Sequence, residues 1–128
     1  MNRPFKDYVG SNGTNYIERW FQKELTDQQR SDLEALIGVL EKQERWGMPD
    51  YRQLIGKHSA LGEVRLRAKP PIRLIGYKKG SEFILLIGCK HKGQIYDPPN
   101  ALDTALSRKN DLESNHGETI DHDYYNYS

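Results

Sequence analysis

The second half of the chain carries the alternation of apolar and polar residues that is typical of β-strands. Residues 62–68 alternate aliphatic with charged side chains, residues 72–77 follow a Pro-Pro break, and residues 82–89 form the most apolar stretch. Because side chains alternate between the two faces of a strand, the arginines of the first segment lie opposite its aliphatic residues. Lys79-Gly80 predicts a hairpin turn between the last two segments. The three strands are therefore expected to form an antiparallel meander.

One helix is strongly indicated in the first half of the chain. Thr26 is a good N-cap residue, and Gln29 three positions later completes the pattern of a capping box. The apolar residues that follow recur at the spacing of one helical face, namely at Leu33, Leu36, Ile37 and Leu40. Gly47 is a candidate terminator. The pattern therefore predicts a helix that runs from Thr26 toward Gly47.

The remaining segments complete the expected order of elements. Residues 1–13 lack periodicity and predict a loose N-terminus, while residues 14–23 are rich in aromatic and β-branched types and predict a first strand. A short second helix is expected from Pro49 toward Gly56, and a final helix after Pro98-Pro99. The order β-α-α-β-β-β-α predicts an α+β fold. Two N-terminal helices and one C-terminal helix are expected to cover only one face of a four-stranded antiparallel sheet.

Length and composition place the protein in a broad class. A chain of 128 residues fits one domain, which we expect to span residues 14–112, followed by a mobile acidic tail at 113–128. Cys89 is the single cysteine, which excludes an intramolecular disulfide and fits a reducing compartment. The sequence shows neither a signal peptide nor an apolar run long enough to span a bilayer. These features predict a cytoplasmic protein without a membrane partner.

Positive charge is concentrated in the predicted strands. Nine basic and two acidic residues fall between positions 57 and 92, which gives this segment a net charge of +7, although the whole chain carries only +1. Such a concentration predicts a phosphate-rich partner, because neutralisation of phosphates dominates nucleic-acid affinity. Residues 111–128 carry −5. This acidic tail could compete with the partner for the basic surface, or it could only aid solubility.

Short motifs in the strands and in the last helix occur in a recognisable order. Glu63-Val64-Arg65 is followed by Ile72-Arg73, then by residues 85–92, and then by Pro98 with Leu102 and Ala105. In this order, over about residues 14–112, the chain resembles the RelE/ParE toxin superfamily, and most closely its phage-derived, HigB-like branch. His91 stands where that branch has the first lysine of a pair.

The resemblance implies a toxin of a type II toxin–antitoxin system that a cognate antitoxin protein neutralises. Many members of the superfamily cleave messenger RNA in the decoding site of the ribosome, and the ParE group instead poisons DNA gyrase. The resemblance therefore implies an endoribonuclease, or mRNA interferase, that inhibits translation without a cofactor. Two alternatives stay open: a non-enzymatic inhibitor of gyrase or another protein, and a degenerate member that only binds RNA. The histidine at position 91 keeps the second alternative open.

Arg65 and Arg73 are the candidate phosphate-stabilising residues. In metal-free cleavage of RNA the ribose 2′-OH attacks the adjacent phosphate, and cations must stabilise the charge that builds on the phosphoryl oxygens. The planar guanidinium suits this role because it meets two phosphate oxygens at once. The Pro70-Pro71 turn favours a shared face for the two arginines. The alternative is that they are solvated strand residues or antitoxin contacts.

His91 is the candidate base that accepts the 2′ proton. Its ordinary pKa of roughly 6.5 is close to working pH, and the positive charge of Lys90 and Lys92 would favour the neutral ring. The alternative is a surface histidine in a basic loop. Lys92 is a second candidate base.

Further basic and aromatic residues are candidates for RNA contacts. They are Arg67, Lys69, Lys78, Lys90 and Tyr96. We expect Arg65, Arg73 and the 90–92 loop to share one cationic hollow. No metal site is expected, since the histidines and aspartates near the C-terminus lack a diagnostic ligand spacing. Cys89 is expected to be a small core residue.

Overall fold

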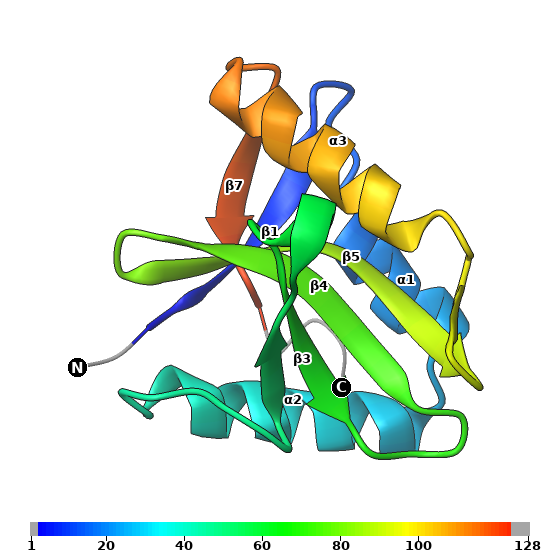
Figure 1. Ribbon diagram of the computed structural model, residues 1–128. Helices are drawn as coiled ribbons and strands as arrows, with labels where there is room; N and C mark the ends of the chain where they lie inside the picture. The colour runs from blue at the N-terminus through cyan, green and yellow to red at the C-terminus, as the bar shows by residue number, and fades with distance from the viewer. Residues whose placement is uncertain (1–2, 124–128) are drawn as a thin grey trace.

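The chain folds around one mixed sheet of seven strands, and helices pack against both of its faces (Figure 1). The computed structural model describes residues 3–123. The strand order is β2-β3-β4-β5-β1-β7, with β6 paired to the end of β5, and within the described range only β1 and β5 pair in parallel. In chain order the elements are β1 (Phe5–Gly10), α1 (Tyr16–Glu24), α2 (Asp27–Glu41), β2 (Tyr51–Gln53), the 3-10 turn η1 (Gly56–His58), β3 (Gly62–Leu66), β4 (Ile72–Lys79), β5 (Glu82–Lys92), β6 (Ile95–Asp97), α3 (Ala101–Glu113) and β7 (Gly117–Asp121).

The central strands bury side chains on both faces of the sheet. Leu74 and Phe83 belong to a core that includes residues of α1 and α2. Their chain neighbours Ile75 and Ile84 belong to a second core, which α3 covers. Neighbouring residues on a strand point to opposite faces. The expectation that helices cover only one face is therefore wrong, and the reason is that β4 and β5 are apolar on both sides. The three-stranded meander β3-β4-β5 itself is as predicted.

The best-indicated helix forms as expected, but it ends early. The Thr26 Oγ1 accepts a hydrogen bond from the Gln29 backbone N–H at 3.1 Å, and the Gln29 side chain accepts one from the Thr26 N–H at 2.9 Å. The helix ends at Glu41, so Gly47 lies beyond it. The indole of Trp46 donates to the Leu40 carbonyl at 2.8 Å. The Leu40 carbonyl also accepts from the Gln43 backbone N–H at 3.1 Å, so the indole adds a second bond at the helix end.

The N-terminal assignments were wrong in detail. Residues 5–10 of the expected loose N-terminus form β1, which lies between β5 and β7. Residues 16–24 of the expected first strand form α1. Asn15 caps this helix, and Ile17 and Phe21, four residues apart, bury on one helical face. Aromatic and β-branched composition misled here because tertiary packing overrode local preference.

Two short strands were also missed. The expected second helix at 49–56 is β2 followed by the start of η1, and Tyr51 of β2 pairs with Val64 of β3 and is buried. β6 forms a hairpin with the end of β5. The sheet therefore has seven strands rather than four. No helix within residues 3–123 is long and apolar enough to cross a membrane.

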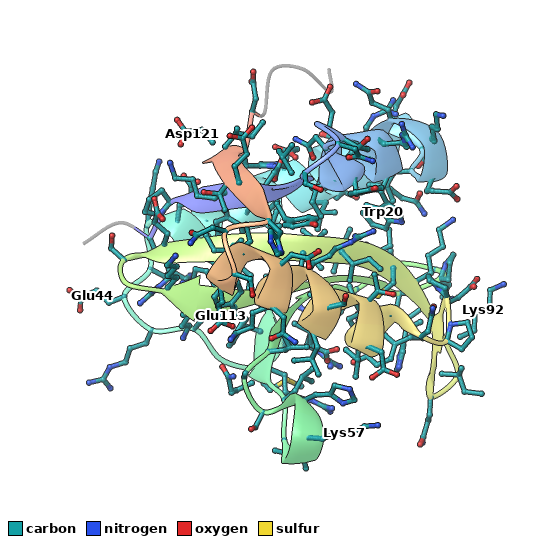
Figure 2. All side chains as sticks on the ribbon, turned by 90° about the horizontal axis from the view of Figure 1, so that it is seen from above. Trp20, Glu44, Lys57, Lys92, Glu113 and Asp121 are labelled. Atoms are coloured by element: carbon teal, nitrogen blue, oxygen red, sulfur yellow. The ribbon has the colours of Figure 1, made fainter. Side chains whose placement is uncertain are left out.

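Part of the expected mobile tail forms a strand. Residues 117–121 form β7 on β1, and Lys6 of β1 forms an ion pair with Asp121 of β7. Asp121 of the expected tail thus pairs with β1 rather than with the basic pocket described below. Figure 2 shows Asp121 and Lys92 at well-separated places on the molecule. Residues 124–128 of the expected tail lie outside the described residues.

A buried histidine fastens the end of this strand. His122 Nδ1 contacts Asp7 Oδ1 at 2.8 Å, and its Nε2 contacts Glu34 Oε1 at 2.7 Å. Burial by itself lowers the pKa of His122, but the hydrogen bonds and charges of Asp7 and Glu34 outweigh it and raise the pKa to about 9. At neutral pH both ring nitrogens are therefore protonated and donate to the carboxylates.

Stability should fall as the pH rises through the pKa of His122. A group whose pKa is raised by folding stabilises the native state fully below its unfolded pKa, near 6.5, and loses that contribution above its folded pKa, about 9. The loss should be about 3 kcal/mol of unfolding free energy. Urea unfolding between pH 6 and pH 9.5 measures it. The difference in unfolding free energy between wild type and His122→Asn should shrink as pH rises. A difference that stays constant over this range would refute the assignment.

Candidate functional site

A polar pocket of about 570 Å³ opens where β2, β3, β4 and the β5–β6 hairpin meet. It lies at the side of the sheet away from β1 and β7. Its lining is charged and polar apart from one proline and one glycine: Arg52, Glu63, Arg65, Pro71, Arg73, His91, Gly93, Gln94 and Tyr96. Three arginines face one carboxylate, so the fixed charges of the pocket sum to +2 when His91 is neutral.

The register of β3 on β4 brings the two candidate arginines together. Arg65 lies directly opposite Arg73 in this antiparallel pair. Directly opposite residues project from the same face of the sheet. The expected shared face is therefore confirmed.

Glu63 is the central residue of the pocket, and sequence reasoning did not single it out. Its side chain is only 2% exposed. Its Oε1 accepts a hydrogen bond from Arg65, and its Oε2 accepts one from the Tyr96 hydroxyl at 2.5 Å. A usable signal was present, because the alternation that assigns Arg65 to one face assigns Glu63, two residues earlier, to the same face.

Arg73 lies deepest among the arginines. Its side chain is 7% exposed, and its Nη1 donates to the carbonyls of Ile72 and Leu66 at 3.0 and 3.4 Å. Its Nε is buried and has no hydrogen-bond partner in the described part of the chain. Burial and the neighbouring Arg65 lower the pKa of Arg73, but a guanidinium keeps its charge at neutral pH. The pocket therefore contains a buried donor that lacks an acceptor.

His91 and Tyr96 form the opposite wall. Their ring centroids are 4.9 Å apart. Burial and the charge of Arg73 lower the pKa of His91, and Glu63 opposes this only in part. The ring is therefore neutral at pH 7, as expected, although the responsible charges are pocket arginines rather than the flanking lysines. Burial and the bond to Glu63 raise the pKa of Tyr96, so its hydroxyl remains a donor.

The lysines beside His91 do not line the pocket. Lys90 lies opposite Ile72, which belongs to the core under α1 and α2, so Lys90 projects from the other face. The Lys92 ammonium lies 3.3 Å from Asp97 and is largely exposed. Figure 2 shows Lys92 at the outer end of the molecule. The predicted hollow therefore gathers Arg65, Arg73 and His91, but it does not include Lys90 and Lys92.

Three further basic candidates also lie elsewhere. Arg67 and Lys69 follow the end of β3 and are absent from the pocket lining. Lys78 stacks on Trp46 and Tyr51, with its Nζ 5.4 and 5.0 Å from the ring centroids. Of the five candidates for RNA contacts, only Tyr96 lines the pocket.

Arg52 lines the pocket, although the sequence analysis did not predict it as a site residue. It lies on β2, directly opposite Glu63, and its Nε is 3.7 Å from Glu63 Oε1. Residues 49–56 were assigned to a helix, which hid this pairing. Detection of β2 would have placed a third guanidinium beside Glu63.

Cys89 lies in the core beside the pocket. Burial raises the pKa of the Cys89 thiol to about 12, and its Sγ lies 3.7 Å from the Arg73 carbonyl. Cys89 is thus a core residue, as expected. Within residues 3–123, no group of three or more His, Cys, Asp and Glu side chains is placed to hold a metal ion.

Comparison with known proteins adds no family assignment. No protein-family model matches the chain, and no curated protein sequence matches it. The resemblance to RelE/ParE toxins therefore remains a prediction, and function must be argued from the pocket.

The pKa of His91 should be measurably low, and Arg73 should be a main cause. Carbon-13-edited NMR titration should give a value below 6.5 in the wild type. Arg73→Gln should raise the pKa of His91. Arg52→Gln should raise it less, because the charge of Arg52 has the smaller effect on His91. Arg45→Gln, an exposed arginine outside the pocket, is the matched control. A wild-type pKa at or above 6.5 would contradict the electrostatic description.

Proposed function

We propose that the protein is a metal-independent endoribonuclease, and that its substrate is messenger RNA on the ribosome. The observation that carries this proposal is the convergence of Arg65, Arg73 and neutral His91 on one polar pocket. Cleavage by an internal 2′-OH needs cations that stabilise the phosphate and an uncharged base that accepts the proton of the hydroxyl. The two arginines and His91 match these needs.

The arginines would bind the scissile phosphate. Arg65 and Arg73 point from neighbouring strands into the same space. Each guanidinium offers paired N–H donors that match two phosphoryl oxygens. Negative charge grows on these oxygens as the 2′ oxygen attacks, so donors aimed at them stabilise the transition state more than the ground state.

His91 would take the proton of the attacking hydroxyl. The 2′ oxygen forms a bond to phosphorus, the bond from phosphorus to the 5′ oxygen breaks, and a 2′,3′-cyclic phosphate results. The pocket opens to solvent beside Arg52, so water can protonate the leaving 5′ oxygen. The Tyr96 hydroxyl donates a hydrogen bond to Glu63 and so holds that carboxylate beside the arginines.

The wider biological role rests on the resemblance. A pocket of about 570 Å³ with a charge of +2 accommodates a nucleotide unit. The ribosome as the site of action, translation inhibition as the outcome and a cognate antitoxin as the partner all follow from the similarity to HigB-like toxins. We propose them together with the nuclease activity.

Induced expression should arrest growth and produce messenger RNA cuts that follow the reading frame. The products should carry 2′,3′-cyclic phosphate and 5′-hydroxyl ends, and EDTA should not prevent cutting in a translating extract. Arg65→Ala and Arg73→Ala should each lower the cleavage rate about 10²–10³-fold, the loss typical of one donor to a developing oxyanion. Lys92→Ala and Arg45→Ala should cut nearly as fast as wild type. Mapping of RNA ends by sequencing measures cleavage by all four variants.

Growth arrest with intact messenger RNA would exclude the nuclease. Blocked supercoiling in that case would identify a gyrase inhibitor. RNA binding without any cut would identify a degenerate member. Unchanged cutting by the double variant of Arg65 and Arg73 would refute the roles assigned to them.

The cleavage rate should rise with pH and then level off. A base acts in its neutral form, so the rate should increase through the lowered pKa of His91, below 6.5, and remain flat to pH 8. His91→Ala should lose this rising limb, and His116→Asn should retain it. A rate that declines over the same range would mean that protonated His91 acts as an acid.

A further inference from the structure

One oxygen atom of Glu63, Oε1, lies close to three guanidinium groups. Its Oε2 is bonded to Tyr96. Its Oε1 bonds to Arg65 and lies 3.7 and 3.9 Å from the Nε atoms of Arg52 and Arg73. A single carboxylate oxygen cannot satisfy so many donors, since each oxygen has about two lone-pair directions. The three arginines therefore lie around Glu63, but not all of their N–H donors have an acceptor in the described part of the chain.

The clearest unmet donor is deep in the pocket. The Nε of Arg73 is buried without a hydrogen-bond acceptor among residues 3–123. A buried donor that lacks an acceptor carries a free-energy cost. In addition, Arg65 and Arg73 lie directly opposite each other, and like charges at such positions repel. A ligand with several anionic oxygens would relieve both problems.

We propose that Glu63 is a resident anion that holds Arg52, Arg65 and Arg73 in place until the phosphate group of a ligand takes over their bonds. Glu63 keeps its bond to Tyr96 through Oε2, while the guanidinium groups turn from Oε1 to the phosphate. The ligand class is a phosphate mono- or diester. This inference shares its site with the proposed nuclease, but it does not require cleavage.

The proposal makes Glu63 a positioning residue with two opposed effects. Its negative charge is hydrogen-bonded to Arg65 and lies within 4 Å of Arg52 and Arg73, so it weakens the attraction of these cations for an incoming phosphate. The same charge orients the cations in the ligand-free protein. Loss of the charge should therefore tighten phosphate binding and at the same time reduce the stability of the empty pocket.

Calorimetric titration with inorganic phosphate in low-salt chloride buffer tests the first effect. Glu63→Gln should bind phosphate about tenfold more tightly than wild type. Arg52→Gln should bind several-fold more weakly, and it should fold normally because Arg52 is 54% exposed. Glu118→Gln removes the same charge from an exposed position on β7 and should bind as wild type does.

Thermal unfolding tests the second effect. Without phosphate, Glu63→Gln should unfold at a lower temperature than wild type, because Arg73 has lost its buried counter-ion. Saturating phosphate should raise the midpoint of Glu63→Gln more than that of wild type, since a tighter ligand stabilises more. A carboxylate with only a structural role would lower the midpoint without changing the phosphate response.

Unchanged or weaker phosphate binding by Glu63→Gln would overturn the proposal, even if RNA cleavage were lost. If that variant does not fold, NMR of the arginine Nε–H groups in wild type decides. The Arg65 and Arg73 signals should shift together as phosphate is added, and static signals would refute the idea. Tighter phosphate binding by the variant, with no RNA cutting by wild type, would keep this inference and reject the nuclease.

Discussion

Repulsion between two arginines, balanced by one buried carboxylate, determines the architecture of the pocket. The β3–β4 register sets Arg65 opposite Arg73, and Glu63 bonds one while lying 3.9 Å from the other. Buried charges are tolerated when they are paired and hydrogen-bonded. Tyr96 bonds to the second oxygen of the same carboxylate, so it fixes Glu63 from the β5–β6 hairpin. Residues of β2, β3, β4 and β6 thus surround the Glu63 carboxylate.

The opposite edge of the sheet has a different role. There β7 pairs with β1, and protonated His122 bonds to the carboxylates of both Asp7 and Glu34. The acidic C-terminal segment contributes to folding at this edge and leaves the cationic pocket open at the other. The pocket therefore keeps its net positive charge, which suits a site that attracts an anionic polymer.

Sequence patterns predicted elements whose signal is local. The capping box at Thr26 and Gln29, the meander and the shared face of Arg65 and Arg73 all follow from spacing of a few residues. The strands at residues 5–10, 51–53 and 117–121 were not predicted, because they form only through pairing with segments distant in the chain, such as β1 with β5 and β7. Arg52 was missed for the same reason, since it lies on β2. Glu63 was within reach of the sequence, because the alternation of β3 places it on the same face as Arg65.

The most direct test of the central claim is a crystal structure of the protein with an oligoribonucleotide whose 2′ oxygens are methylated and so cannot attack. The account predicts a phosphate within hydrogen-bond distance of both Arg65 and Arg73, with a 2′ oxygen beside His91 and Glu63 still bonded to Tyr96. An oligonucleotide bound on the α1–α2 face, or a pocket in which Arg65 still bonds Glu63 while RNA lies elsewhere, would contradict it.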